Sequence, residues 1–304
     1  MKRFYAIAAA AALACTLFCG CSRKKTGKAD STAQTDPVLT TAAESIPELS
    51  SDADNENLPD ERDFKPAEGS YVYDNAKILS KEEVSACNNY AEWLYENYLI
   101  NTAVVTTDSL DDKAPYDYAA DAYNKIYEGK GSGLLLLINN DTNIDILYKT
   151  GSCNTFISAE DSDLALYWAT KEIVAGDYKS AVLRMLKLAE KCPQHIFDNA
   201  GIFSIEQINA LEAVFSSYEN EVSLLATNNP SEIPNEDILR SYYDRRYKDS
   251  KGYMLMLDAY SKSLIAFSEE PLPDSFEAAL KKANESVKKG DYQGAVKAAA
   301  DAIK

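Results

Sequence analysis

The run GSGLLLLINN at residues 131–140 constrains the fold of this chain more than any other stretch. Two glycines open it, five aliphatic residues follow without polar alternation, and two asparagines close it. An apolar run this short between turn signals is typical of a strand buried on both faces of a sheet, because a helix would need about ten residues or more. The run KGYMLMLD at 251–258 repeats the pattern 119 residues later. The sequence therefore predicts two versions of one α/β domain.

Further echoes indicate a tandem duplication. Residues 198–204 (DNAGIFS) repeat 74–80 (DNAKILS), Pro234 repeats Pro115, residues 264–267 repeat 145–148, and residues 290–296 (GDYQGAV) repeat 176–182 (GDYKSAV). The echoes keep the same order in both halves, and their spacing shortens in two small steps, as deletions between collinear copies would produce. Chance explains one such echo more easily than four in order.

Local signals place the elements of the first copy. Ser80 followed by Glu83 is the signature of a capping box, which starts a helix. The other expected elements are a strand at 102–107, a helix from Pro115 to about Tyr127, a strand at 144–148 that pairs with the central run, and a helical region at 158–190 interrupted at 176–178.

The N-terminus carries the pattern of an export signal. Lys2 and Arg3 form a basic start, and residues 4–18 are nearly all apolar, a run too short to span a bilayer comfortably. The signal ends in FCGC, which resembles a bacterial lipobox with Cys21 as the lipidated residue. We therefore expect a signal at 1–20 and an outward-facing chain, anchored to the cell membrane by a lipid on Cys21. An ordinary signal peptide cleaved nearby is the alternative.

Composition divides the rest of the chain. Residues 21–69 are rich in Ser, Thr, Asp, Glu, Ala and Pro, with Phe64 as their aromatic residue, so they are expected to be a disordered acidic tether. The first domain is expected at 70–192 and a degenerate second domain at 196–304. The formal net charge of −17 argues against a nucleic-acid partner, because such binding relies on basic side chains that neutralise phosphates.

Several motifs of the first copy, taken in order, resemble those of the TPM domain family. They are DNAKILS at 74–80, VVTTDSL at 104–110, the glycine-led central run and GDY at 176–178. The resemblance covers about residues 70–192 and, more weakly, 196–304. The family includes thylakoid-lumen proteins linked to photosystem II repair and many bacterial envelope proteins. The resemblance implies two tandem domains, each a central, mostly parallel sheet sandwiched by helices, which agrees with the alternation of strands and helices.

The resemblance leaves two functions open. Some relatives are described as acid phosphatases, and some as calcium-binding proteins. Family members commonly carry an acidic residue before the glycine of the central strand, and here Lys130 stands at that place. They often carry a basic pair in the following turn, where this chain has DTNI at 141–144. In the second copy, Asn228 stands at about the position that Asp108 has in the first. We therefore expect a binding or assembly module with an envelope protein as its partner and little or no catalysis. The alternative is a calcium- or metal-dependent phosphatase in the first domain.

Candidate site residues gather where strands of the first copy end. Ligands of open α/β sheets bind outside the carboxyl ends of the strands, and Asp108 follows such an end. Asp74, Asp108 and Asp111 are candidate calcium ligands, with Asp112 and Asn75 as further oxygen donors. The alternative is an exposed acidic loop in which Asp74 orders a turn. No catalytic residue and no certain cofactor can be assigned.

Three cysteines follow the signal and tether. Aligning the copies places Leu211 at Cys87 and Leu272 at about Cys153, and these apolar replacements favour small buried thiols. A disulfide between two of the three, Cys192 included, stays open, because connectivity cannot be read from sequence alone.

Overall fold

The computed structural model describes residues 69–128, 131–228, 236–248 and 250–303. The predicted signal, Cys21 and nearly all of the predicted tether lie outside the described residues, as do Lys130 and Pro234. Among the described helices, none is both long enough and apolar enough to cross a membrane.

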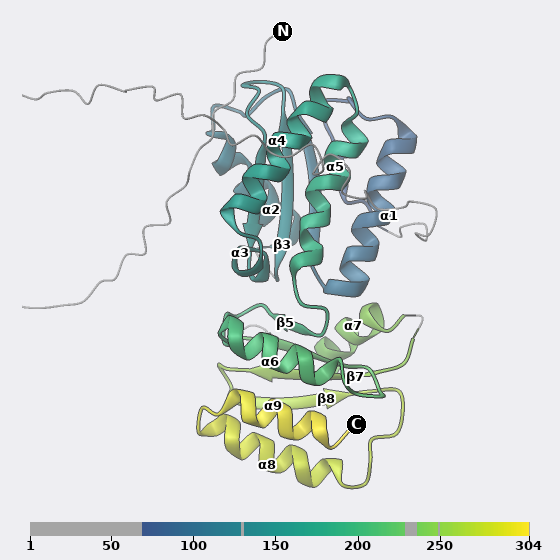
Figure 1. Ribbon diagram of the computed structural model, residues 1–304, viewed down its shortest axis with the longest axis vertical. Coiled ribbons are helices and arrows are strands. Elements are labelled where there is room, and N and C mark those ends of the chain that lie inside the picture. Colours follow the sequence, from purple (N-terminus) through teal and green to yellow (C-terminus); the bar gives the residue numbers. More distant parts are fainter. Residues whose placement is uncertain (1–68, 129–130, 229–235, 249, 304) are drawn as a thin grey trace, which may run out of the picture. The chain divides into compact units, whose positions relative to one another are not determined.

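Two four-stranded sheets form the framework of the described residues (Figure 1). The first sheet consists of β1 (Val72–Asp74), β2 (Asn101–Thr107), β3 (Gly133–Asn139) and β4 (Ile146–Thr150), in that order, and the second of β5 (Ile196–Asp198), β6 (Val222–Thr227), β7 (Tyr253–Asp258) and β8 (Ser263–Phe267). In each sheet the first three strands run parallel and the fourth is antiparallel to the third. The predicted α/β fold with two mostly parallel sheets is confirmed.

Helices cover both faces of each sheet. They are α1 (Lys81–Tyr98), α2 (Pro115–Tyr127), α3 (Ser152–Phe156), α4 (Ala159–Ala175), α5 (Tyr178–Leu186), the 3-10 helix η3 (Lys187–Lys191), α6 (Ile205–Phe215), α7 (Glu236–Arg246), α8 (Phe276–Lys288) and α9 (Tyr292–Asp301). In the first half, α1, α4 and α5 lie on one face of the sheet and α2 on the other (Figure 1). In the second half, α6, α8 and α9 lie on one face and α7 on the other.

The central strand β3 divides the core of the first half. All seven of its residues are buried. Leu134 and Leu136 join the core formed with α1, α4 and α5, whereas Leu135 and Leu137 face the opposite way and pack with Tyr123 of α2. This alternation follows from the two-residue period of a strand and explains why residues 134–138 are all apolar.

Capping boxes begin corresponding helices of the two halves. The Ser80 hydroxyl accepts a hydrogen bond from the Glu83 N–H (3.2 Å), and the Glu83 carboxylate accepts one from the Ser80 N–H (2.6 Å). Ser204 and Gln207 make the same reciprocal pair at the start of α6. The helix start predicted at Ser80 is confirmed, and each box satisfies two N–H groups that the first helical turn leaves unpaired.

Two local features differ from the sequence-based expectation. The strand that pairs with β3 begins at Ile146 rather than at residue 144, because the preceding turn is longer. The Asp145 carboxylate accepts the Asn139 N–H in that turn (3.0 Å), and the Asn139 amide donates to the Ile144 carbonyl (3.3 Å). The structure also has a short helix, α3, at a place where the sequence predicts none.

The expected match of Leu272 with Cys153 is wrong. Cys153 lies fully buried in α3, whereas Leu272 is 37% exposed in the loop after β8. The described part of the second half has no helix between β8 and α8, so it offers no position equivalent to α3. The match of Leu211 with Cys87 agrees with the structure, because both side chains are buried in corresponding helices, α6 and α1.

A tyrosine packs over a glycine at the start of the central strand in each half: Gly133 is the first residue of β3, and Gly252 directly precedes β7. A Cβ atom added to Gly133 would lie 1.9 Å from the Tyr123 hydroxyl oxygen, and one added to Gly252 would lie 2.2 Å from a ring carbon of Tyr247. Both distances are far below van der Waals contact. The glycines therefore allow α2 and α7 to approach their sheets closely.

Replacing Gly133 by alanine tests this close approach. We expect Gly133→Ala to lower the free energy of unfolding by about 1–3 kcal/mol, the usual cost of overpacking a core. Chemical denaturation followed by circular dichroism measures the change. Gly69→Ala is the matched control, since its Cβ atom would meet nothing closer than 3.5 Å. Equal stability of the two variants would contradict the argument.

Candidate functional site

The candidate site residues lie at one edge of the first sheet. Because β1, β2 and β3 run parallel, their carboxyl ends meet at the same edge. Asp74 ends β1, Asp108 follows β2, and Asn140 and Asp141 follow β3. The fold therefore brings these polar side chains to the place where open α/β sheets bind their ligands.

Asp74 holds the turn between β1 and α1. Its Oδ1 atom accepts hydrogen bonds from the Ile78 N–H (3.1 Å) and the Thr106 hydroxyl (2.6 Å). Its Oδ2 atom accepts the Leu79 N–H (3.1 Å). Both carboxylate oxygens are thus used by the protein itself, which satisfies two backbone N–H groups ahead of α1. Asn75 is exposed beside this turn.

Asp198 plays the same part in the second half. Its carboxylate accepts the N–H groups of Ala200 (3.3 Å), Ile202 (3.0 Å) and Phe203 (2.8 Å), and its residue is almost fully buried. In both halves, therefore, an aspartate at the end of the first strand holds the turn that leads into the first helix. The second half has Asn228 after β6, so it keeps this turn without the acidic residue that follows β2.

Two loops of the first half meet around Asp108. The Asn140 amide donates to Asp108 Oδ1 (3.1 Å), and Asp141 Oδ2 accepts the Leu110 N–H (3.2 Å). Ser109 donates its hydroxyl to Asp111 Oδ1 (3.1 Å). The structure thus adds Asp141 to the candidate residues. Its place directly after the central strand is the sequence signal that could have identified it.

The backbone holds the Asp111 and Asp112 side chains in an exposed turn. Both residues have positive φ angles, 51° and 62°, which Asp tolerates better than most residues because its short side chain can bond locally. Asp108, Asp111 and Asp112 thus belong to one exposed loop between β2 and α2.

The number and availability of oxygen ligands determine how well a cation could bind at the carboxyl-end edge of the first sheet. Calcium takes six to eight oxygen ligands. Asp74 fits poorly as a ligand because its carboxylate oxygens already accept three hydrogen bonds. Asp108 and Asp111, in contrast, have exposed side chains whose carboxylate oxygens could coordinate a cation. Among the described residues, no three Asp, Glu, His or Cys side chains gather closely enough to hold a metal ion. Calcium binding by Asp74, Asp108 and Asp111 stays a prediction.

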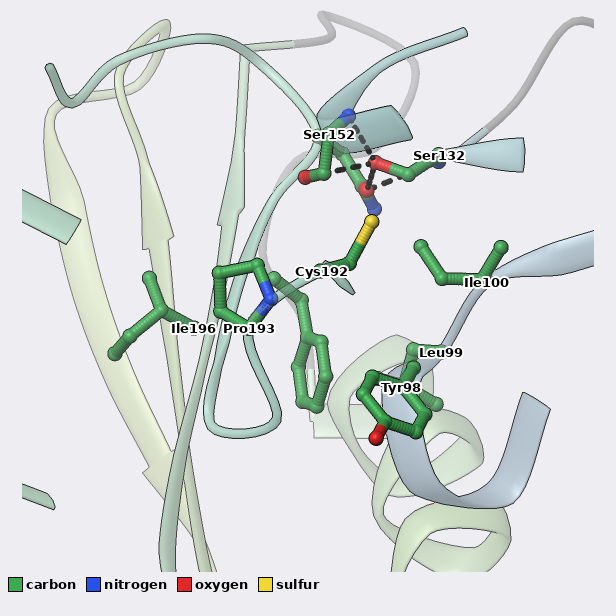
Figure 2. A pocket seen from close by; sticks show the side chains of 10 residues that line it. Tyr98, Leu99, Ile100, Ser132, Ser152, Cys192, Pro193 and Ile196 are labelled. Atoms are coloured by element: carbon green, nitrogen blue, oxygen red, sulfur yellow. Dashed lines mark hydrogen bonds between the residues drawn. The ribbon is translucent and has the colours of Figure 1, made fainter. Parts of the chain in front are cut away.

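The corresponding edge of the second half contacts the first half. Asn199, the counterpart of Asn75, accepts hydrogen bonds at Oδ1 from the Ser132 N–H (3.0 Å) and hydroxyl (2.8 Å). Ser132 in turn accepts the Ser152 N–H at its hydroxyl oxygen (2.9 Å). Figure 2 shows this network at one end of a narrow crevice that Cys192 also lines. The strand-end asparagine of the second half is therefore used in packing.

Removing the Asp74 carboxylate distinguishes a structural role from ligand binding. We expect Asp74→Ala to lower the free energy of unfolding by about 2–4 kcal/mol without any added cation, because two partly buried N–H groups and the Thr106 hydroxyl lose a charged acceptor. Asp108→Ala is the matched control, with an expected change within about 0.5 kcal/mol, since Asp108 is exposed. Urea denaturation in the presence of a chelator measures both. An unchanged Asp74→Ala variant would contradict the structural role.

Comparisons with known proteins identify the first half. A search of curated proteins found no significant match. Similar solved structures include the N-terminal domain of a protein from P. gingivalis (17% identity, TM-score 0.37, covering 44% of this chain and 92% of that one). Others are a protein from Bizionia argentinensis (15%, 0.35, 40% and 88%) and the N-terminal domain of a Corynebacterium glutamicum protein (15%, 0.34, 40% and 78%). The family model described as the TPM domain matches residues 72–192, and the chain therefore contains a TPM domain.

Proposed function

We propose that this chain is a binding or assembly module of the bacterial cell envelope, with little or no catalysis. The observation that carries the proposal is the hydrogen bonding of Asp74, whose carboxylate oxygens serve the β1–α1 turn. A carboxylate committed to three donors of its own protein is a poor ligand for a catalytic cation. Asp198 has the same commitment in the second half, which supports a structural role in both.

The second half supports the first in this proposal. It lacks an acidic residue after β6, where Asn228 stands. Its strand-end Asn199 bonds to Ser132, at the start of the central strand of the first half. This arrangement suits a scaffold that holds the TPM domain and leaves the Asp108 edge exposed to a partner protein.

A lipid on Cys21 would attach the module to the outer side of the cell membrane. The support is the sequence pattern of a basic start, an apolar run and FCGC, followed by an acidic tether. The partners are then the membrane, through the anchor, and an envelope protein.

Metabolic labelling with a fatty acid tests the anchor. We expect the wild-type protein to incorporate labelled palmitate and to sediment with membranes, and Cys21→Ser to lose both properties. Cys19→Ser is the matched control and should keep both. Labelling that survives in Cys21→Ser would contradict lipidation at this residue.

A calcium- or metal-dependent phosphatase in the first half is the second candidate. The observation that favours it is the meeting of the Asp108 and Asp141 loops, which places exposed acidic side chains at the carboxyl ends of β2 and β3. In such an enzyme Asp108 and Asp111 would hold the cation, and the cation would stabilise the charge of a phosphoryl group.

Thermal unfolding with millimolar calcium separates the two candidates. A ligand at 100 times its dissociation constant stabilises a protein by about 2.7 kcal/mol, which raises the midpoint of a domain by several degrees. If the chain is a binding module, calcium should leave the midpoint of thermal unfolding unchanged. Wild type and Asp108→Asn should then also show the same rate of phosphomonoester hydrolysis. A calcium shift and a hydrolysis rate that both disappear in Asp108→Asn would favour the phosphatase and overturn our proposal.

A further inference from the structure

Two cysteines that are far apart in the sequence meet in the core of the first half. Cys153 lies in α3, and Cys192 follows η3 directly. The Cys192 thiol donates a hydrogen bond to the sulfur of Cys153, with 3.9 Å between the two sulfur atoms. Both residues are almost fully buried, at 0% and 4% exposure, and both belong to the same hydrophobic core.

Local hydrogen bonds fix the backbone on both sides of this pair. The chain reaches α3 through Gly151, whose φ angle is +57°, and the next residue, Ser152, donates its N–H to the Ser132 hydroxyl (2.9 Å). Cys192 donates its own N–H to the Ala189 carbonyl (3.0 Å). Figure 2 shows the Cys192 sulfur pointing toward the network of Ser132 and Ser152. Cys153 is the residue that follows Ser152 in the chain.

We propose that Cys153 and Cys192 form an intramolecular disulfide in the exported protein. The two thiols lose two protons and two electrons as the sulfur–sulfur bond forms, and a disulfide oxidant, either a thiol–disulfide oxidoreductase or oxidised glutathione, is reduced to its dithiol or thiols. A disulfide is about 2.05 Å long, so the sulfurs must approach by about 2 Å, a change within reach of side-chain rotation. Formation in the cell rests on the proposed export, because oxidising compartments lie outside the cytosol.

The bond forms during folding rather than afterwards. The hydrogen bond from Cys192 and the burial of the side chain raise the pKa of the Cys153 thiol above its ordinary value. Thiolates are the reactive species in thiol–disulfide exchange, and a buried thiol is also inaccessible to an oxidant. A reduced chain that has already folded is therefore expected to oxidise slowly.

The disulfide would hold the helical layer of the first half in place. It joins the two ends of the segment that contains α4, α5 and η3, which covers one face of the first sheet. None of the six cysteines lies beyond residue 192, so the corresponding layer of the second half, α8 and α9, has no such link. Cys87, in α1, stays a thiol in this arrangement.

Oxidative refolding of the full-length chain tests the proposal. The reduced, denatured protein is refolded in a mixture of reduced and oxidised glutathione, remaining thiols are alkylated, and tryptic peptides are analysed by mass spectrometry. We expect peptides 150–171 and 192–240 to be joined, with a mass two hydrogens below the sum of the separate peptides. Peptide 82–113, which contains Cys87, should carry the alkyl group.

Variants and a thermal measurement complete the test. Cys192→Ser should lose the linked peptide and Cys87→Ser should keep it. Addition of a reductant should lower the midpoint of wild type and Cys87→Ser by several degrees and leave that of Cys192→Ser unmoved. Alkylation of both Cys153 and Cys192 in refolded wild type, or a link that involves another cysteine, would overturn the proposal. A linked peptide in a protein that takes up no fatty acid would support the disulfide and contradict the lipid anchor, so the two proposals can fail independently.

Discussion

The burial of β3 on both faces is the constraint on which the first half depends. A strand whose seven residues are all buried needs a hydrogen-bonded neighbour on each side and an apolar layer above and below. β2 and β4 provide the neighbours, and α2 on one face and α1, α4 and α5 on the other provide the layers. Each buried leucine contributes about 1.5–3 kcal/mol, so this run alone favours the layered fold strongly. β7 imposes the same requirement on the second half.

Burial of the central strand leaves the strand ends as the place where the halves can diverge. The Asp74 and Asp198 turns are alike because each must close the connection from a first strand to a first helix. Beyond that turn the edges differ: the first half carries Asp108, and the second carries Asn228. One edge is exposed, whereas Asn199 of the other is engaged with Ser132. The two strand-end edges therefore differ in what they contact, although the turns before them are alike.

The sequence predicts the features that have local signals. The capping box at Ser80, the helix from Pro115 and the central runs depend on residues a few positions apart, and all are found. The helix α3 has five residues, too few for a periodic pattern. The contact of Cys153 with Cys192 depends on how α4 and α5 pack, and the bond from Thr106 to Asp74 joins residues 32 apart. Such contacts exist only once the fold has formed.

The same argument explains why an aspartate at a strand end cannot be assigned a role from its position alone. Its role depends on how many donors the folded chain directs at its oxygens. Asp74 accepts two backbone N–H groups and a hydroxyl, so releasing it to a ligand would leave partly buried donors unpaired at a cost of up to about 1–3 kcal/mol each. Asp108 is exposed and accepts the side-chain amide of Asn140, a group that water can satisfy in its place. Freeing the Asp108 carboxylate from its hydrogen bond therefore costs less free energy than freeing that of Asp74. We expect any ligand of this edge to bind at Asp108 first.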